Sequence, residues 1–468
     1  MGRKSYLAKN TLLFALGNFG TKFISFFLVP IYTKVLTTED YGIVDLVSTI
    51  GIVLAPLIIL NISESLMRFP LDKNADNEGI LSVGIHIWFF SFPLTGILIL
   101  LTSAIPIVSQ YSIYIGLYTF ALASSQLFLS YLRGKEKLLR YSIGNIINSL
   151  FVAVFNIFFL VVFRFGISGY LLAYVVANFI TAIYAVFAGG VISDLKKYHI
   201  DKKLLKTMLK YSIVLAPNTF LWWITNSSDR IMVTAMISAA ANGIYAVSYK
   251  IPTLLSTVAQ IFNQAWSYSA IHENESADKT EYSNAIYNGL VGVSTIAASI
   301  MLLIIKPFLF VYVDHQYFEA WKYTPYLIIG FVFLSLGSFL ATPYVVEKDS
   351  KGFLFSATFG AFVNIIFNFV LIPVIGVSGA ALSTCISYIA VVVYRVIDTR
   401  KYIIIRVLNL KHLICYTALI FSSVFLYFQG ILFIIIQCLM LIIIVYSFRD
   451  VLLQVWGTVK NKIHKKKH

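Results

Sequence analysis

Three basic residues, Lys22, Arg230 and Lys250, lie inside long apolar stretches of the sequence. A charged side chain within a membrane-spanning segment is costly and usually functional, and a local ion pair is the competing explanation. Lys and Arg are the usual partners of phosphate groups, and a site lined by several of them attracts anions. The three positions therefore predict a positively charged cavity that binds an anionic substrate, with phosphate as the expected group.

Polar residues accompany these cations at helical spacing. Asn18 lies four residues before Lys22, and Asn226 lies four residues before Arg230. After Lys250 a polar side chain recurs every three or four residues, at Thr253, Thr257, Gln260, Gln264 and Ser267. Such spacing places one polar stripe along one helix face, which favours a water-filled cavity over a polar seam against a neighbouring helix. We expect the two asparagines and the two glutamines to line the cavity with the three cations.

Two carboxylates are candidates for ion coupling, Asp45 and Asp229. Asp229 and Arg230 are adjacent and point about 100° apart on a helix, so they do not pair on one face. One of them can pair with another helix while the other faces the pathway. Asp45 lies near a helix end, where a wet, non-functional position is the alternative. Glu64 precedes Arg68 by four residues, and a local ion pair is expected there.

No pattern typical of catalysis or metal binding occurs. The sequence has no G-x-x-x-x-G-K-[ST], H-E-x-x-H or G-x-S-x-G motif. Its seven histidines are scattered, and its three cysteines lie in apolar stretches without metal-like spacing. We therefore expect no catalytic residue, no metal site and no cofactor.

The elements that must position these residues are membrane-spanning helices. The chain has 468 residues, of which 59% are hydrophobic and 12% charged, which excludes a cytosolic enzyme or a disordered protein. Its apolar runs are long enough to span a bilayer and do not alternate, so they predict helices. The expected spans are 10–33, 41–66, 80–103, 106–132, 142–163, 169–191, 209–236, 243–266, 284–309, 321–345, 353–373, 377–396, 410–428 and 430–448.

The distribution of positive charge predicts the topology. With both termini on one side of the membrane, 29 of the 36 Lys and Arg residues fall on that side and four on the other. Positive residues concentrate on the cytoplasmic side of membrane proteins. The sequence therefore predicts fourteen helices with both termini cytoplasmic. This topology accounts for the net charge of +15 without a nucleic-acid partner.

Two short internal matches indicate a repeat. Residues 41–43 (YGI) match 242–244 (NGI), 201 positions later, and residues 165–169 (FGISG) match 375–379 (IGVSG), 210 positions later. An offset of six helices predicts a parallel repeat about an axis along the membrane normal. We expect an all-α polytopic protein with two six-helix lobes, followed by two C-terminal helices and a basic tail. The expected boundaries are 1–192, 193–397 and 398–468, with residues 193–210 linking the lobes.

Several of these residues resemble a known family. They are Leu36 to Gly42 (LTTEDYG) after a first helix with Pro30, Ser228 to Val233 (SDRIMV), and Gly243 to Tyr245 (GIY) followed by Lys250. These stretches resemble the bacterial polysaccharide-transport family, the O-antigen, capsule and exopolysaccharide repeat-unit flippases. That family belongs to a superfamily that also holds multidrug extruders and the lipid II flippase. The resemblance covers roughly residues 5–400, mostly in hydropathy and loop spacing.

The resemblance implies a fold, a substrate and a location. It implies two six-helix lobes with alternating access around a cationic cavity, in the bacterial cytoplasmic membrane. It also implies an undecaprenyl-diphosphate-linked oligosaccharide as substrate, with glycosyltransferases and a polymerase of the same pathway as partners. Lys22, Arg230 and Lys250 occupy the positions that match a cavity role. A cation-coupled multidrug extruder is the alternative, and a membrane-embedded polymerase is a more distant one because no external loop is large enough for catalysis.

Overall fold

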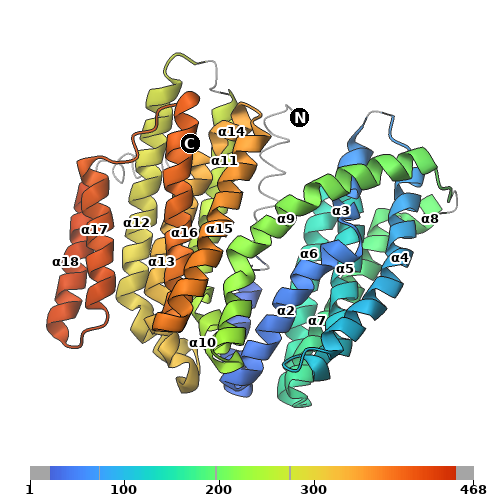
Figure 1. Cartoon of the computed structure of the whole chain (residues 1–468), viewed down its shortest axis with the longest axis horizontal. Coiled ribbons are helices and arrows are strands. Elements are labelled where there is room, and N and C mark those ends of the chain that lie inside the picture. Colours follow the sequence, from blue (N-terminus) through green and yellow to red (C-terminus); the bar gives the residue numbers. More distant parts are fainter. Residues whose placement is uncertain (1–19, 21, 73, 196–197, 273–275, 450–468) are drawn as a thin grey trace, which may run out of the picture. The chain divides into compact units, whose positions relative to one another are not determined.

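The computed structural model describes residues 20, 22–72, 74–195, 198–272 and 276–449 (Figure 1). This part of the chain is mostly helical and contains no strand. Residues 22–35 form the first described helix. The longer helices that follow are α2 (Thr38–Ile58), α4 (Asn77–Ser103), α5 (Ser112–Gly134), α6 (Leu138–Asn156), α7 (Gly166–Gly189), α9 (Lys202–Met236), α10 (Ala239–Ser248), α11 (Lys250–His272), α12 (Lys279–Tyr312), α13 (Thr324–Leu340), α15 (Ser350–Ile375), α16 (Val377–Asp398), α17 (Leu410–Phe425) and α18 (Ile431–Ser447).

Short helices extend or connect these elements. The α-helical ones are α3 (Ile62–Arg68), α8 (Val191–Leu195) and α14 (Thr342–Val346). A π-helix, η3 (Ile157–Val162), continues α6, and 3-10 turns are η1 (Phe69–Leu71), η2 (Ser109–Tyr111), η4 (His315–Lys322) and η5 (Thr399–Lys401).

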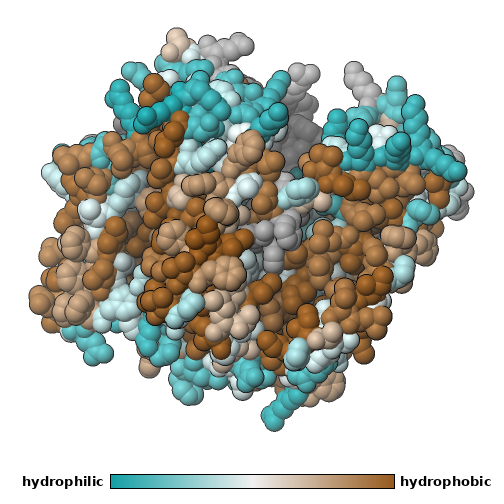
Figure 2. All heavy atoms as spheres, in the orientation of Figure 1, coloured by the Kyte–Doolittle hydropathy of each residue, from teal (hydrophilic) through white to brown (hydrophobic). Residues whose placement is uncertain are grey.

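Every predicted span contains helix in the described residues, although the α-helix of the span 106–132 begins only at Ser112. Nine described helices are long and apolar enough to cross a membrane, and α17 and α18 are shorter apolar helices. In each unit described below, hydrophobic side chains cover the middle of the helices and hydrophilic ones gather at their ends (Figure 2). An all-α, multi-pass membrane protein is therefore confirmed.

Two predicted spans are each built from two helices. The span 41–66 is α2 followed by α3, because Leu60 and Asn61 take positive φ angles of 51° and 54° after Pro56. The span 243–266 is α10 followed by α11, with a break at Tyr249. The first break reaches across the fold, because the Asn61 side-chain amide donates to the Ser212 carbonyl oxygen of α9, at 3.3 Å.

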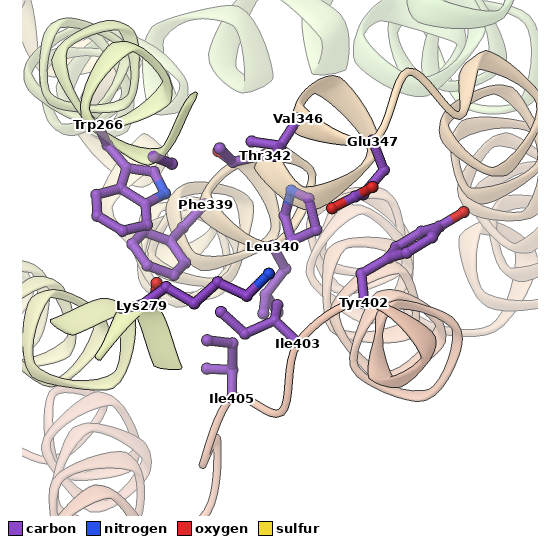
Figure 3. Close-up of a pocket in the computed structure, with 13 residues that line it drawn as sticks. Trp266, Lys279, Phe339, Leu340, Thr342, Val346, Glu347, Tyr402, Ile403 and Ile405 are labelled. Carbon is purple, nitrogen blue, oxygen red and sulfur yellow. The ribbon is translucent and has the colours of Figure 1, made fainter. Parts of the chain in front are cut away.

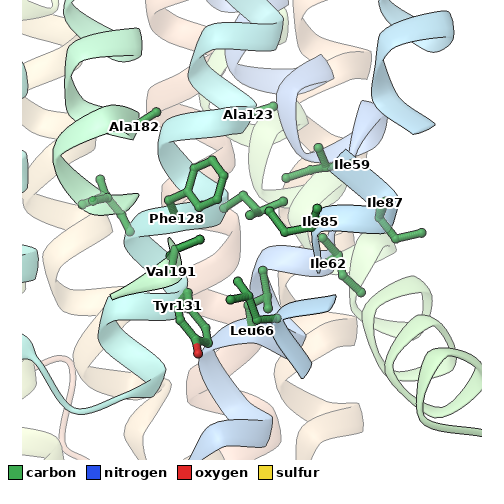
Figure 4. Packing of buried hydrophobic residues seen from close by; sticks show 14 of the residues in the cluster. Ile59, Ile62, Leu66, Ile85, Ile87, Ala123, Phe128, Tyr131, Ala182 and Val191 are labelled. Carbon is green, nitrogen blue, oxygen red and sulfur yellow. The ribbon is translucent and has the colours of Figure 1, made fainter. Parts of the chain in front are cut away.

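The chain divides into two compact units, one ending at Ala246 and the other starting at Val247. In the first unit α5 is the central helix and packs against α2, α3, α4, α6 and α7. Its Ser124 and Ser125 are buried in these contacts, which explains the polar residues that dilute its hydropathy. The core around it joins Phe128 and Tyr131 of α5 to Ile59, Ile62 and Leu66 of the α2–α3 segment (Figure 4).

In the second unit α13 takes the corresponding place. It packs against α11, α12, α16 and α17, and α15 packs against α16. Counted along the chain, α5 contains the fourth predicted span and α13 the tenth, so the central helices are six spans apart, as a six-helix repeat requires. The helices α17 and α18 pack against each other and against α12.

Equivalent hydrogen bonds occur in the two units. In the first, Asn148 of α6 donates to Thr181 of α7 at 3.1 Å, and in the second, Asn364 of α15 donates to Thr384 of α16 at 3.4 Å. The Tyr131 hydroxyl donates to Asp194 at 2.7 Å, and the Tyr344 hydroxyl donates to Asp398, also at 2.7 Å. Tyr131 lies in the last turns of α5, and Tyr344 lies in α14, directly after α13. Asp194 lies in α8, directly after α7, and Asp398 is the last residue of α16. These pairs agree with the predicted parallel repeat.

The segment 193–210, expected as a linker, is partly helical. The helix α9 begins at Lys202, and Leu204, Leu205 and Leu209 pack on the first unit's core while Met208 is fully buried. Exposed lysines occupy the other face, at Lys202, Lys203, Lys206 and Lys210. The contacts thus assign α9 to the first unit, whereas the lobe boundary at residues 192 and 193 remains a prediction from the repeat.

The expected ion pair between Glu64 and Arg68 is wrong. Arg68 instead bonds Asp72 at 2.7 Å, with both side chains about half exposed. The chain leaves α3 through the 3-10 turn η1 at Phe69, which carries Asp72 back toward Arg68. Arg68 thus pairs with the acidic residue four positions after it, Asp72, and not with the one four positions before it, Glu64.

Candidate functional site

The start of α2 and the start of α10 touch backbone to backbone at two glycines. A Cβ on Gly42 would lie 1.8 Å from the Ala239 carbonyl oxygen, and a Cβ on Gly243 would lie 1.9 Å from the Thr38 carbonyl oxygen. The contact is reciprocal, because Gly42 and Gly243, like Thr38 and Ala239, are 201 positions apart. Self-complementary contacts of this kind arise from two-fold symmetry. The first internal match of the sequence therefore marks a crossing where only glycine fits.

A buried ion pair lies one turn beyond this crossing. Arg230 of α9 donates from Nη1 to Oδ1 of Asp45 of α2, at 2.8 Å. Asn242 of α10 donates from its amide to the Gly42 carbonyl oxygen at 3.0 Å and to Oδ2 of Asp45 at 3.4 Å. Asp45 thereby accepts bonds from two other helices and ties α9 and α10 to α2.

Asp229 adds a second carboxylate to the same cluster. Its Oδ2 accepts the Tyr245 hydroxyl at 2.6 Å, and its Oδ1 accepts the Arg230 backbone N–H at 2.9 Å. Asp229 and Asp45 are 2% and 8% exposed, and Asn242 and Tyr245 are fully buried. We call these five residues, Asp45, Asp229, Arg230, Asn242 and Tyr245, the charged cluster.

The charges in this cluster decide what it can do. Asp45 and Arg230 form a pair, so the guanidinium is balanced, and Asp229 is stabilised by hydrogen bonds. Removing one partner of a buried pair leaves an uncompensated charge, which is strongly unfavourable. The cluster therefore holds α2, α9 and α10 together. In the described part of the chain no group of three or more His, Cys, Asp or Glu could hold a metal ion.

A family model for "Polysaccharide biosynthesis protein" matches residues 7–268, more than half of the chain. The chain belongs to the polysaccharide biosynthesis protein family. No curated protein matches the sequence significantly. The charged cluster lies within the matched region.

Solved structures show the fold of this family member. The lipid II flippase MurJ in an inward closed conformation matches 94% of this chain and all of its own, with a TM-score of 0.69 and 15% identity. An inward-facing multidrug resistance MATE family transporter of the MOP superfamily matches 83% of this chain and 94% of its own, with a TM-score of 0.64 and 13% identity. A mutant of the Vibrio cholerae MATE transporter VcmN matches 85% of this chain and 98% of its own, with a TM-score of 0.51 and 13% identity. The chain thus shares its fold with MurJ and the MATE transporters.

The remaining site residues predicted from the sequence are distributed over other segments. Lys22 is exposed on the helix 22–35, Lys250 is the first residue of α11 and is half-buried, and Gln260 of α11 is exposed. Asn18 lies outside the described residues, as do the side chains of Asn226 and Gln264. The structure brings together Asp45, Asp229 and Arg230. Convergence of Lys22, Arg230 and Lys250 on one cavity remains a prediction.

The polar stripe of α11 satisfies much of its own hydrogen bonding. Thr253 donates to the Lys250 carbonyl oxygen at 2.7 Å, and Thr257 donates to that of Thr253 at 2.9 Å. Near the other end, Ser267 lies 3.4 Å from the Thr342 hydroxyl of α14. Hydroxyls bonded to their own helix need no partner across a gap. The Ser267 end is thus a seam against α14, whereas whether the Lys250 end faces a cavity stays a prediction.

Sequence reasoning identified the carboxylates and Arg230 but not Asn242 and Tyr245 as site residues. These two residues are three positions apart and therefore lie on adjoining parts of one face of α10. Asn242 was recognised only as part of the internal match, although a buried amide beside a glycine is a signal for a close helix crossing. Asn242 and Tyr245, three residues apart and shortly after the charged residues Asp229 and Arg230, could have indicated the cluster.

Proposed function

We propose that this protein is a flippase for undecaprenyl-diphosphate-linked oligosaccharide repeat units in surface polysaccharide synthesis. The observation that carries the proposal is the family match over residues 7–268, within a chain that has the MurJ fold over nearly its whole length. The distribution of positive charge supports the proposed topology, with both termini cytoplasmic, and the resemblance to the bacterial polysaccharide-transport family supports the bacterial cytoplasmic membrane as its location. Glycosyltransferases and a polymerase of the same pathway are the proposed partners.

Arg230 and Asp45 give this proposal a mechanism. The substrate's diphosphate carries negative charge and prefers a bidentate guanidinium partner. When a diphosphate reaches Arg230 it replaces Asp45, and the bond that ties α9 to α2 is lost. The α2–α10 crossing at Gly42 and Gly243 then opens, and the head group moves outward while the lipid tail stays in the bilayer. Lys22 and Lys250 supply further positive charge along the path.

Asp45 and Asp229 are the proposed ion-coupling groups. Asp45, once released by Arg230, is a carboxylate inside the membrane that gains from a proton or a sodium ion. Binding of that ion neutralises the site and favours reclosure after the substrate leaves. Asp229 keeps its bonds to Tyr245 and to the Arg230 backbone, so it changes less in this cycle.

A cation-coupled multidrug extruder is the second candidate. The observation that favours it is the surplus of carboxylate in the charged cluster, two against one guanidinium, since organic cations are bound by acidic groups. The two candidates differ in the sign of the substrate charge and therefore in their response to substitution. Neutralising Arg230 weakens handling of an anion, whereas neutralising Asp45 or Asp229 weakens handling of a cation.

Complementation tests the proposal directly. The protein is expressed in a strain that lacks its repeat-unit flippase but keeps the pathway's glycosyltransferases and polymerase. Restored surface polysaccharide supports the flippase. If surface polysaccharide stays as low as in the flippase-deleted strain, and the protein raises resistance to cationic drugs in an extruder-deleted strain, the flippase proposal is overturned in favour of the extruder.

A further inference from the structure

The second unit contains a pocket at one end of its helices, separate from the charged cluster. The pocket is a hollow open to solvent, and it is lined by residues of the last turns of α11, the start of α12, the α13–α14 junction and the segment after η5 (Figure 3). Its open side leaves room for a chain that enters from the surface. Phe339, Leu340, Ile403 and Ile405 give it apolar walls.

Two donors face this apolar space. The indole of Trp266 is 6% exposed, and its Nε1–H has no hydrogen-bond partner among the described residues. The ring is stacked on Phe339 at 4.6 Å, and its nitrogen points into the pocket (Figure 3). The Lys279 side chain extends into the same space from the start of α12 (Figure 3). A buried donor without an acceptor is unfavourable by an amount comparable to a lost hydrogen bond, so an acceptor is expected here.

The position of the pocket identifies the kind of acceptor. Trp266 lies in the last two turns of α11, Lys279 is the first residue of α12, and Tyr402 follows η5, so the lining residues lie at helix ends. Glu347 lines the outer part of the pocket, and Lys348, Asp349 and Lys401 are further charged residues at this end of the helices (Figure 3). Trp, Tyr and Lys at the ends of membrane helices are typical of the head-group level of a bilayer. Phosphoryl groups on apolar chains are the anions present at that depth.

We propose that this pocket binds a phosphoryl head group carried on an apolar chain. The phosphoryl oxygens accept from the Trp266 Nε1–H and the Lys279 ammonium, and the first part of the chain lies against Phe339, Leu340 and Ile403. The chemistry is shared by glycerophospholipids and by prenyl phosphates. The site is independent of the charged cluster and binds its ligand whether or not the protein translocates a glycan.

The test observes Trp266 directly. The full chain is labelled with 5-fluorotryptophan, held in maltoside detergent micelles that contain no phosphate, and studied by fluorine magnetic resonance, where six tryptophans give six signals. The Trp266→Phe variant assigns its signal and keeps the stacking on Phe339. Dihexanoyl phosphatidic acid and geranyl phosphate are the probes, and inorganic phosphate and dihexanoyl glycerol lack the chain or the head group. We expect a saturable shift of the Trp266 signal with at least one probe, at concentrations about tenfold below any effect of the two partial molecules.

Matched variants separate the pocket from general lipid binding. Lys279→Gln should weaken the probe about tenfold, as expected for loss of one charged hydrogen bond. Lys348→Gln, at an exposed lysine that does not line the pocket, should leave binding unchanged. Ile403→Phe, which narrows the pocket without adding a tryptophan, should abolish the shift. The probe that binds more tightly identifies the glycerol or the isoprenoid source.

Three results overturn the proposal. One is a Trp266 signal that neither probe moves, as expected if only water satisfies the indole. Another is equal binding by wild type and Lys279→Gln. The third is a shift that dihexanoyl glycerol reproduces at the same concentration. If Trp266→Phe fails to fold, Trp266→Tyr assigns the signal instead.

Discussion

Arg230 and Asp45 lie 185 positions apart in the chain, yet Nη1 of one is 2.8 Å from Oδ1 of the other. Their side chains are 19% and 9% exposed. This contact is the interhelix ion pair that the sequence left as one of two readings of Arg230. It also makes the guanidinium a balanced charge in this structure, so an anionic substrate has to compete for it.

The first prediction separates stability from function at this pair. Arg230→Gln leaves Asp45 without its counter-ion and should lower the stability of the folded protein by about 1–3 kcal/mol, less than for a fully buried pair. The double variant Asp45→Asn/Arg230→Gln removes both charges and should recover most of that loss. Thermal unfolding in detergent measures both. Export should stay low in the double variant, because the proposed diphosphate partner is still missing.

If Arg230→Gln and Asp45→Asn/Arg230→Gln are equally stable, Asp45 and Arg230 do not stabilise each other. Full glycan export by a stable double variant would remove Arg230 from the mechanism. Lys322→Gln serves as the control, since Lys322 and Glu319 form an exposed pair whose loss should change stability by less than about 1 kcal/mol.

The second prediction concerns the glycine crossing. Gly42→Ala or Gly243→Ala places a methyl group within 2 Å of a carbonyl oxygen, so α2 and α10 must separate. We expect a lower unfolding temperature and faster labelling of a cysteine introduced at Ser238, beside the crossing. Gly96→Ala on α4 is the matched control, because its Cβ meets nothing within 4 Å and alanine favours helix. Unchanged stability and labelling in both crossing variants would contradict the close approach.

The sequence allowed the helices to be predicted well and the charged cluster only in part. Apolar run length alone located α4, α7 and α12, because the bilayer demands long uninterrupted spans. It did not reveal the break at Leu60 and Asn61, since the positive φ angles there depend on contacts with α9. Hydropathy also treats residue 202 as loop, because the lysines of α9 outweigh the leucines that anchor its other face.

The same limit applies to the site residues. Asp229 and Arg230 stand out because charge in an apolar run is rare. Their partners Tyr245 and Asn242 do not, because a tyrosine or asparagine in such a run is ordinary. Which carboxylate pairs with Arg230 depends on how α2 and α9 pack, and periodicity within one helix carries no information about that.

The third prediction is a pH dependence at Asp194, outside the membrane-spanning helices. Burial alone raises the pKa of this carboxyl, but hydrogen bonds from Lys135 and Tyr131, each at 2.7 Å, outweigh it and hold the pKa below the ordinary value. The carboxyl pKa is lower in the folded protein than in the unfolded chain, where it is about 3.9. The ionised carboxylate therefore stabilises the fold at pH values above the unfolded pKa, and this stabilisation is lost as the pH falls through the folded pKa. Asp194→Asn should therefore be less stable than wild type at pH 7, by a difference that is constant down to about pH 5 and then shrinks.

Thermal unfolding of both proteins between pH 8 and pH 3 measures this difference. Tyr131→Phe should show the same trend with a smaller amplitude, because Lys135 still holds the carboxylate. A difference between wild type and Asp194→Asn that grows as the pH falls would have the wrong sign and would refute the assignment.

The last prediction concerns Lys22 and Lys250, whose meeting in one cavity rests on the sequence. Both side chains are at least partly exposed, so neutralising them should leave the protein's abundance nearly unchanged. Lys22→Ala/Lys250→Ala should nonetheless sharply reduce surface polysaccharide, because two cations are lost from the proposed path of a diphosphate. Lys→Arg at either position should retain partial export, since charge matters more there than fork geometry.

Lys34→Ala/Lys348→Ala, at two exposed lysines, is the matched control. The assay is surface polysaccharide in the complemented flippase-deleted strain, with protein level measured in the same cells. Full export by the Lys22→Ala/Lys250→Ala variant would exclude the cationic cavity, and loss of protein with retained specific export would assign the two lysines a structural role.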